Sequence, residues 1–234
     1  MTTTIKSLKS FKTPLRYPGG KSRACKKMDP FFPDLRDYDA YYEPFLGGGS
    51  VALHITKKYP KLKIIVNDLY EPLYNFWLRL QVDGDYVHSQ LQQLKSRYPD
   101  RGSARGLFLD AKEKLYDLDV SDKDRAVCFY IINKCSFSGL TESSSFSEQA
   151  SDANFSIRGI DKLPVYSKLI KDWYITNVDY HHLLGDKEKT FVYLDPPYDI
   201  KDNLYGRKGS IHKKFDHDDF AKSCEIYNSE MLIS

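Results

Sequence analysis

Residues 190–199 read TFVYLDPPYD, in which a short apolar run is followed at once by an acid, two prolines and an aromatic residue. The run at 191–194 predicts a strand that ends before Pro196, because proline lacks a donor for the sheet ladder and has a fixed φ. Asp195 and the ring of Tyr198 therefore stand where a buried strand ends. This arrangement indicates a binding site at the end of the strand.

Outward from this strand, strand-like and helical runs alternate along much of the chain. The expected strands are 41–42, 63–66, 172–176, 190–194 and 231–234. The expected helices between them are 50–59, 71–81 and 220–227. Such alternation predicts an α/β fold with a Rossmann-like, mostly parallel sheet and helices on both faces.

The middle of the chain, residues 77–165, departs from this alternation because strand-like runs vanish there. Its first half shows helical patterns at 85–97, 104–118 and 122–134. The serine-rich run that follows, SFSGLTESSSFSEQASDANFS, predicts an exposed loop or hairpin. We therefore expect a catalytic, cofactor-binding domain in two parts, 1–76 and 166–234, interrupted by a helical insertion with a hairpin at 77–165.

Composition limits the class of protein. The chain has 234 residues, 41% of them hydrophobic, which is enough to bury a sizeable core. No apolar run approaches the roughly 18 residues that span a bilayer. The basic start also lacks the apolar centre of a signal peptide, which favours a soluble, cytoplasmic protein. The cysteines have no metal or redox spacing, so we expect free thiols and no metal site at Cys25, Cys128, Cys135 and Cys224.

Basic residues are concentrated in two regions. Residues 1–28 carry eight lysines and arginines and no acid. A second cluster follows the DPPY segment and consists of Lys201, Arg207, Lys208, Lys213 and Lys214. Such stripes suit a polyanion, because each neutralised phosphate releases counterions. The charge distribution alone is equally consistent with a solvated surface and a frayed terminus that bind no polyanion.

The run EPFLGGGS, residues 43–50, follows an expected strand and opens an expected helix. Its three glycines let the backbone turn tightly and approach a ligand closely, although an ordinary loop has the same composition. Asp68 ends the next strand, 19 residues after Gly49, a spacing typical of an acid that holds ribose hydroxyls. Its alternative is a helix N-cap. Together the two features predict a nucleoside site at adjacent strand ends.

Lys21 lies in the tight turn of PLRYPGGKSRA, after Tyr17. By itself this is a basic turn. Next to a nucleoside site, however, the ammonium group suits a carboxylate and the tyrosine ring suits an apolar ligand face. S-adenosylmethionine combines adenine, ribose and a carboxylate. NAD or ATP would call for a GxGxxG or Walker lysine motif, and the sequence contains neither.

The DPPY segment suits chemistry on a planar amino group. Asp195 and the main-chain carbonyl group that follows it can both accept hydrogen bonds from one NH2 group, while Tyr198 offers a stacking face. The lone pair of an adenine amino nitrogen is delocalised into the ring. Two acceptors that favour a pyramidal nitrogen concentrate this lone pair and aim it at a methyl donor, so positioning and electrostatics drive the transfer.

The order of these motifs resembles the Dam-like family of adenine-specific DNA methyltransferases. The matching segments are LRYPGGK, EPFLGGGS, NDLYEPLYNFW, NKCSFSGL, ITNVDY and VYLDPPY, which extend over nearly the whole chain from Pro14 onward. The resemblance implies a site-specific enzyme that transfers a methyl group from S-adenosyl-L-methionine to the N6 amino group of adenine in double-stranded DNA. The target base would be flipped out of the duplex. The expected partners are therefore double-stranded DNA and a companion restriction endonuclease.

The resemblance also assigns roles to residues. The implied catalytic residues are Asp195, Pro196, Pro197 and Tyr198. The implied cofactor-binding residues are Tyr17, Lys21, Glu43, Phe45, Gly47, Gly49, Asp68, Asn177, Val178 and Asp195. In the hairpin, Lys134 would contact phosphate and Phe137 would wedge into the base stack. Further implied DNA contacts are Ser138, Leu140, Glu142, Arg207 and Lys208. A polar surface loop is the alternative interpretation of the hairpin.

Two departures from the family pattern qualify these expectations. Relatives that read GATC carry an arginine where this chain has Glu142, and a carboxylate cannot donate to guanine, so GATC is not the expected target. Family members also continue past SEMLIS, so we expect further sheet strands to be missing. A binding module without turnover is therefore one alternative function. The same chemistry on cytosine, RNA or a protein side chain is another, although the acid at position 195 favours adenine.

Overall fold

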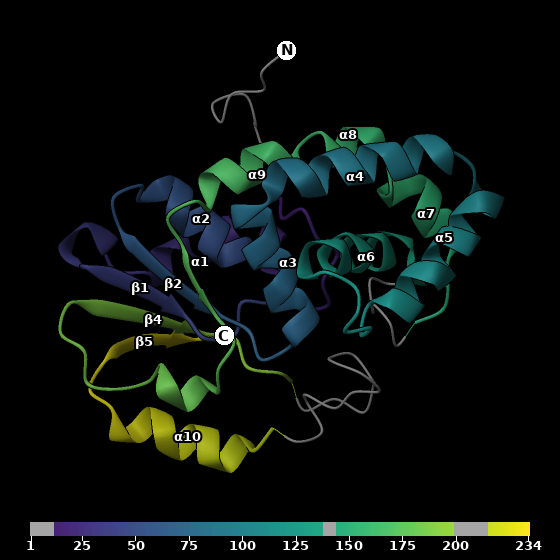
Figure 1. Ribbon diagram of the computed structural model, residues 1–234. Coiled ribbons are helices and arrows are strands. Elements are labelled where there is room, and N and C mark those ends of the chain that lie inside the picture. Colours follow the sequence, from purple (N-terminus) through teal and green to yellow (C-terminus); the bar gives the residue numbers. More distant parts are fainter. Residues whose placement is uncertain (1–11, 138–143, 199–214) are drawn as a thin grey trace.

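The computed structural model describes residues 12–137, 144–198 and 215–234. Within these ranges the chain forms a five-stranded sheet in the order β3-β2-β1-β4-β5, with all neighbouring strands parallel. The strands are β1 Ala40–Glu43, β2 Lys63–Asn67, β3 Tyr174–Thr176, β4 Thr190–Leu194 and β5 Glu230–Ile233. The predicted parallel α/β sheet is confirmed, and each predicted strand has a counterpart (Figure 1).

The register of the central strands brings three chain segments to one edge of the sheet. Ala40 of β1 pairs with Lys63 of β2 on one side and with Thr190 of β4 on the other. Because the strands are parallel and in step, their carboxyl ends lie next to each other. The residues that follow β1, β2 and β4 therefore meet at this edge, as ligand sites in open α/β sheets do.

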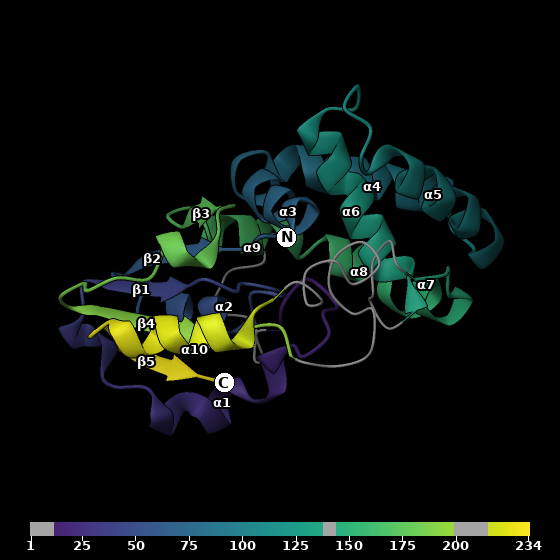
Figure 2. The same cartoon turned by 90° about the horizontal axis from the view of Figure 1, so that it is seen from below.

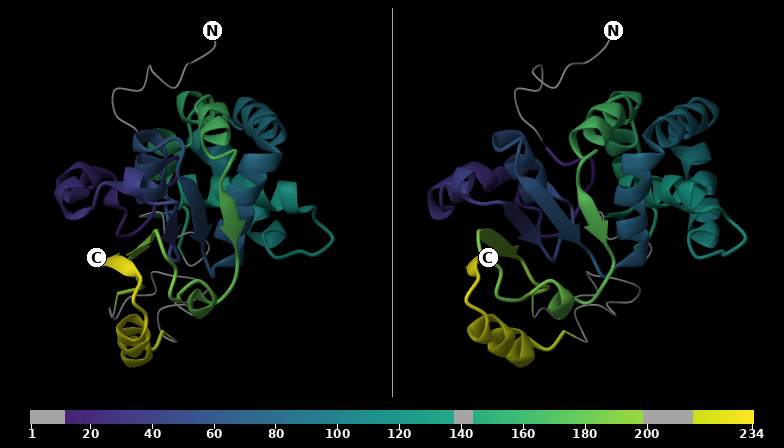
Figure 3. Two further views of the ribbon diagram at one scale, coloured as in Figure 1. Left: turned by 90° about the vertical axis from the view of Figure 1, so that its left-hand side faces the viewer. Right: turned by 60° about the vertical axis from the view of Figure 1, so that its left-hand side comes forward.

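Side chains alternate between the two faces of the sheet, as the pleat requires. Tyr41, Phe191 and Tyr193 belong to the main core, together with residues of α2 (Ser50–Lys58) and α3 (Glu71–Val82). Val192 and Leu194 point to the opposite face and pack with Phe220 of α10 (His217–Ile226). Figure 3 shows α10 on the side of the sheet away from α3. The prediction of helices on both faces is confirmed.

Most of the remaining helices gather beside the sheet rather than on it (Figure 1, Figure 2). They are α4 Gly84–Arg97, α5 Arg101–Lys114, α6 Asp122–Cys135, α7 Glu148–Asn154 and α8 Ile157–Ile160, with α1 Cys25–Met28 and α9 Leu163–Leu169 elsewhere. Helix α6 packs against α3, α4, α5 and α7, and all of residues 126–135 are buried. A helix that is buried on all sides in this way, Asn133 and Lys134 included, occupies the centre of its group.

The apolar core is continuous between the sheet and this helical group. Phe76 of α3 contacts Phe129 and Tyr130 of α6, with ring centroids 5.7 and 5.9 Å apart. Residue 77, the expected first residue of the insertion, lies inside α3. A division of the chain at 77 and 165 stays a proposal, because the side chains of α3 belong to one core cluster together with those of the sheet and of α6.

The serine-rich run at 136–156 differs in part from the prediction. An antiparallel bridge joins Ser136 to Phe146, so the chain does reverse direction at the base of the expected hairpin. Residues 148–154, however, form helix α7, with Ser147 as a side-chain N-cap. Ser156 caps α8 in the same way. Two serines of the run that predicts a loop are thus helix caps, because their hydroxyl groups accept hydrogen bonds from free amides of the first turn.

The structure also bears on the membrane, metal and cysteine expectations. In the described part of the chain, no helix has the length and apolar character needed to cross a membrane. Residues 12–137, 144–198 and 215–234 contain no group of three or more histidines, cysteines and acids arranged to hold a metal. The cysteines are free thiols, and burial raises the pKa of Cys128 and of Cys135 to about 12.

Candidate active site

A cavity of about 530 Å³ lies at the carboxyl edge of the sheet. It is lined by residues that follow each of the central strands and by the turn that contains Lys21. The lining segments are 17–21, 43–51, 67–69, 179–181 and 195–197, with Phe215, Asp216 and Asp219 from the start of α10. Most of the residues implied for cofactor binding and catalysis therefore meet in one cavity.

The glycine turn after β1 fits between two aromatic rings. Gly47 and Gly49 adopt φ values of 50° and 67°, the left-handed region that glycine tolerates best. A Cβ atom on Gly47 would lie 2.9 Å from the ring of Tyr17, and one on Gly49 would lie 2.7 Å from the ring of Trp77. The indole of Trp77 also donates to the carbonyl oxygen of Gly47 at 3.2 Å. The turn therefore has room for backbone only.

Asp68 holds the glycine turn against the end of β2. Its Oδ2 accepts from the amide of Gly47 at 2.8 Å, and its Oδ1 accepts from the amide of Tyr70 at 2.9 Å. The N-cap of α3 is Tyr70, so the N-cap alternative for Asp68 does not apply. Burial raises the pKa of Asp68 to about 6, although the two amide bonds oppose that rise.

Lys21 and Asp195, 174 residues apart in sequence, form an ion pair in the cavity. The Nζ atom lies 2.8 Å from Oδ1 and 2.6 Å from Oδ2 of Asp195, and the two side chains are 16% and 20% exposed. The hydroxyl of Tyr198 lies 2.5 Å from the same Nζ and donates to Asp195 Oδ1 at 2.9 Å. Burial lowers the pKa of Lys21, but its bonds to Asp195 and Tyr198 outweigh burial and raise it.

Glu43, at the end of β1, is a buried acid next to these groups. It is 2% exposed, and the hydroxyl of Tyr41 donates to its Oε2 at 2.7 Å. Burial raises the pKa of Glu43 to about 8; the Tyr41 bond opposes the rise and the negative charge of Asp195 adds to it. At neutral pH the carboxyl group is therefore mostly protonated.

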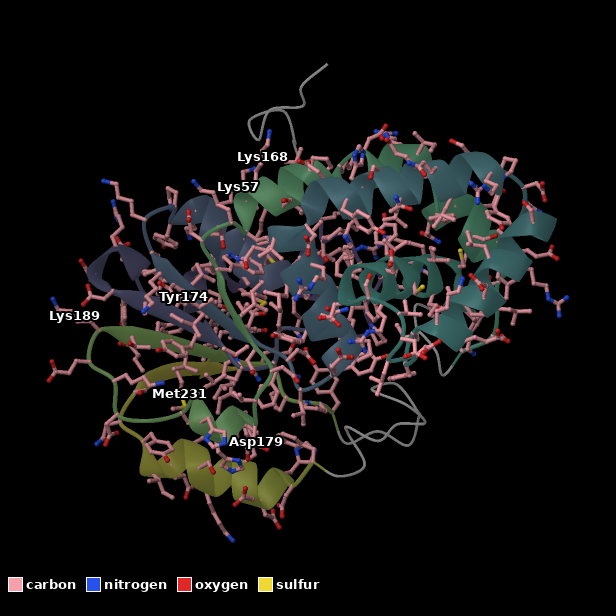
Figure 4. All side chains as sticks on the ribbon, in the orientation of Figure 1. Lys57, Lys168, Tyr174, Asp179, Lys189 and Met231 are labelled. Carbon is pink, nitrogen blue, oxygen red and sulfur yellow. The ribbon has the colours of Figure 1, made fainter. Side chains whose placement is uncertain are left out.

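The segment after β3 supplies a cavity wall that begins two residues later than expected. Asn177 donates to the carbonyl oxygen of Asp68 at 2.7 Å, and the Val178 amide donates to Asn67 at 2.9 Å. These residues anchor the segment, whereas Asp179 and Tyr180 line the cavity. Figure 4 labels Asp179 beside α10.

Aromatic rings form one side of the cavity. Phe45, Tyr180 and Phe215 lie with centroids 5.4 to 5.7 Å apart, in tilted and edge-on arrangements. Such a wall suits a planar, apolar ligand face. Of these residues only Phe45 is expected from the sequence, because Tyr180 and Phe215 belong to separate segments that meet only in the folded chain. The aromatic residue in ITNVDY is the one signal that could have identified Tyr180.

His181 is a further residue that sequence analysis does not find. Its Nδ1 lies 2.5 Å from Asp179 Oδ1, and its Nε2 lies 2.8 Å from Asp219 Oδ2. Burial lowers the pKa of His181, but its bonds to the two acids outweigh burial and raise it. The imidazole thus joins the segment after β3 to α10. A lone histidine outside any spacing pattern gives no sequence signal for such a role.

The residues implied for DNA binding are only partly described. Phe137 follows α6 and is 61% exposed, as a wedge residue requires. Lys134 is 9% exposed, with its Nζ 5.2 Å from the ring centroid of Tyr130, and burial lowers its pKa to about 7. A phosphate contact would require this side chain to turn outward. Outside the described residues lie Ser138, Leu140, Glu142, Arg207 and Lys208.

Comparison with known proteins identifies relatives that are named methyltransferases or methylases. Two relatives are named type II methyltransferases. The first, M.MjaIII of Methanocaldococcus jannaschii, is 25% identical over 91% of this chain and 78% of its own length. M1.LlaDCHI of Lactococcus lactis is 24% identical over 87% of this chain and 72% of its own length. The modification methylase StsI of Streptococcus sanguinis is 24% identical over 86% of this chain but only 31% of its own length.

The sequence model for the D12 class N6 adenine-specific DNA methyltransferases matches residues 17–234. This range includes every segment that lines the cavity, from the turn with Lys21 to the start of α10. The predicted family is thus confirmed over nearly the whole chain. The protein belongs to the D12 class of N6 adenine-specific DNA methyltransferases.

Proposed function

We propose that the protein transfers a methyl group from S-adenosyl-L-methionine to the N6 amino group of an adenine that is flipped out of double-stranded DNA. The reaction would take place inside the cell, where the DNA is. The observation that carries this proposal is the cavity itself. It brings Asp195 of the DPPY turn, the glycine turn and Asp68 to the same edge of a parallel sheet.

The donor set of the cavity fits S-adenosyl-L-methionine. This molecule carries two positive groups and one carboxylate, and six acids line the cavity: Glu43, Asp68, Asp179, Asp195, Asp216 and Asp219. Each oxygen of Asp68 accepts one amide bond and keeps a second lone pair for a ribose hydroxyl. The rings of Phe45 and Tyr180 would face the adenine, and Lys21 would face the carboxylate. When bound, the cofactor supplies an electrophilic methyl group.

The DPPY turn would receive the target amine. Asp195 and the carbonyl oxygen of Pro196 would accept its two hydrogen atoms, which favours a pyramidal nitrogen whose lone pair points at the methyl group. Tyr198, 37% exposed, would stack on the target base. Fixed acceptors of this kind lower the barrier because they need no reorganisation during the reaction. For Asp195 to act in this way, Lys21 must leave its carboxylate.

DNA binding is proposed for the side of the molecule where the hairpin begins. The exposed ring of Phe137 would fill the space that the flipped base leaves, and residues 77–165 would act as the target-recognition insertion. Two relatives are named type II methyltransferases, which supports the proposal of a companion restriction endonuclease with the same recognition sequence.

The test is single-molecule sequencing of DNA from cells that lack adenine methylation and express the wild type or Asp195→Ala. We expect N6-methyladenine in one sequence context with the wild type and none with the variant. Unmodified DNA with the wild type would contradict the proposal. If calorimetry then detected binding of S-adenosylmethionine, the result would favour a binding module without turnover. Methylation of cytosine alone would favour the other alternative.

A further inference from the structure

In the cavity the ammonium group of Lys21 forms an ion pair with Asp195, the carboxylate that the proposed reaction needs as a hydrogen-bond acceptor. The ammonium of Lys21 contacts both carboxylate oxygens of Asp195, at 2.8 and 2.6 Å, and the hydroxyl of Tyr198 at 2.5 Å. It also reaches the carbonyl oxygen of Gly19 at 3.3 Å. A nitrogen with donors directed at Asp195 thus lies where the target amine would have to bind.

We propose that Lys21 exchanges partners: it neutralises Asp195 in the ligand-free protein and moves to the carboxylate of the bound cofactor, which frees Asp195 for the target amine. This inference rests on the proposed function. It makes Lys21 a positioning residue that couples occupation of the cofactor site to the availability of the acceptor.

The first argument for the exchange is charge balance. Both side chains of the pair are largely shielded from solvent, at 16% and 20% exposure. Removing one member of such a pair leaves the other as a partly buried charge without compensation, which is strongly unfavourable. A neutral base amine therefore cannot displace the ammonium unless Lys21 finds another anion.

The second argument is the scarcity of cations in the cavity. Among the described residues that line it, Lys21 is the only lysine or arginine. The cofactor carboxylate and Asp195 thus compete for the same ammonium group. The neighbouring acid Glu43 offers weak competition, because it is buried, accepts from the hydroxyl of Tyr41 and is mostly protonated at neutral pH.

The third argument is reach. Lys21 begins a short 3-10 turn directly after Gly19 and Gly20, on the same cavity wall as Tyr17. A lysine side chain is a compact charge on a flexible four-carbon stem, so it can change partners without moving the backbone.

The exchange can be tested by calorimetry with two ligands that differ in one group. S-adenosylhomocysteine carries the carboxylate, whereas S-adenosyl-3-thiopropylamine, its decarboxylated form, does not. Because Asp195→Asn removes the competitor for Lys21, we expect it to tighten S-adenosylhomocysteine binding by about tenfold, ~1.4 kcal/mol, and to leave the decarboxylated ligand unchanged. In a Lys21→Met background the Asp195→Asn effect should disappear, and Lys21→Arg should preserve part of it.

Opposite results would overturn the exchange. Weaker binding of S-adenosylhomocysteine to Asp195→Asn would mean that Asp195 itself holds the ligand. Equal effects on both ligands would mean that the carboxylate plays no part. If the variants do not fold, as judged by circular dichroism, the wild type still decides: the lysine Nζ NMR signal of Lys21 should shift with S-adenosylhomocysteine only.

Two further outcomes separate the exchange from the proposed function. Failure of the wild type to bind S-adenosylhomocysteine would overturn the proposed cofactor as well as the exchange. A wild type that methylates DNA but shows no ligand-specific shift of the Lys21 signal would overturn the exchange alone.

Discussion

At the scale of single residues, the cavity depends on positions where no other side chain fits. Gly49 combines a φ of 67° with a Cβ position 2.7 Å from the Trp77 ring. Trp77 is fully buried in α3, so it cannot move aside without disturbing the main core. The sequence signal for this site is three consecutive glycines. At Gly49 the reason is steric, because the ring of Trp77, in a helix about thirty residues further along the chain, leaves no room for a Cβ atom.

We predict that Gly49→Ala lowers the free energy of unfolding by about 1–3 kcal/mol from backbone strain alone, with a further loss from the collision with Trp77. Gly106→Ala is a matched control, because Gly106 lies in α5 with nothing within 4 Å of a Cβ atom. Alanine should stabilise that helix by roughly 0.5–1 kcal/mol. Urea unfolding of both variants measures the difference, and equal effects would contradict the steric account.

Glu43 gives a prediction about pH. Its pKa in the folded protein is about 8, above the ordinary 4.5, so the folded state binds this proton more tightly than the unfolded chain. The free energy of unfolding should therefore fall as pH rises through this window, by roughly 3–5 kcal/mol for Glu43 alone. Glu43→Gln keeps an acceptor for Tyr41 and removes the titration. Urea unfolding between about pH 5 and pH 8 should show a flatter profile for the variant; parallel profiles would refute the assignment.

At the scale of elements, one side chain fastens the N-terminal segment to helix α6. Asn133 accepts from the amide of Arg16 at 2.9 Å and donates to the carbonyl oxygen of Arg16 at 2.6 Å. The guanidinium of Arg16 in turn donates to the carbonyl oxygen of Ser136, at the base of the expected hairpin. The segment that carries Lys21 and the start of the hairpin therefore share one set of hydrogen bonds.

Asn133→Ala should lower the free energy of unfolding by about 2–5 kcal/mol, because it leaves both backbone groups of Arg16 without their partners. Asn133 is fully buried, so water cannot replace these bonds without entering the core. Gln92→Ala, which removes an exposed bond to Asp161, should change stability by roughly 0.5 kcal/mol or less. A loss for Asn133→Ala as small as that for the control would rule out the fastening role.

The elements also mark how far sequence reasoning extends. Strand β4 and helix α6 follow from the sequence because a run of apolar residues and a capped periodic pattern need no tertiary information. Helices α7 and α8 could not be predicted, since they are only seven and four residues long and start at serines that equally suit a loop. The Lys21–Asp195 pair and the bridge made by His181 arise from contacts between distant segments, which no local pattern contains.

At the scale of the whole molecule, the sheet and the helical group share one core. The rings of Phe76, Phe129 and Tyr130 join α3 to α6, and α3 in turn packs on the sheet. A shared core of this kind favours a single cooperative unfolding transition, even though the candidate site lies at the edge of the sheet and Phe137 follows α6 in the helical group.

We therefore predict that Phe129→Ala, which opens a cavity in α6, destabilises the protein by about 3–5 kcal/mol. Near-ultraviolet and far-ultraviolet circular dichroism should lose their signals together. Leu118→Ala, at a position 89% exposed, is the control and should change little. Two separate transitions would contradict a common core and would instead favour independent domains divided near residues 77 and 165.

The central claim is that Asp195 accepts the amine of a target adenine in the cavity. The most direct measurement is incorporation of labelled methyl groups from S-adenosylmethionine into mixed-sequence DNA by the wild type and Asp195→Ala, with nucleoside analysis of the product and DNA affinity measured in parallel. The account predicts label in N6-methyladenine for the wild type and none for the variant, with DNA affinity preserved. Continued transfer by Asp195→Ala, or label on another base, would contradict it.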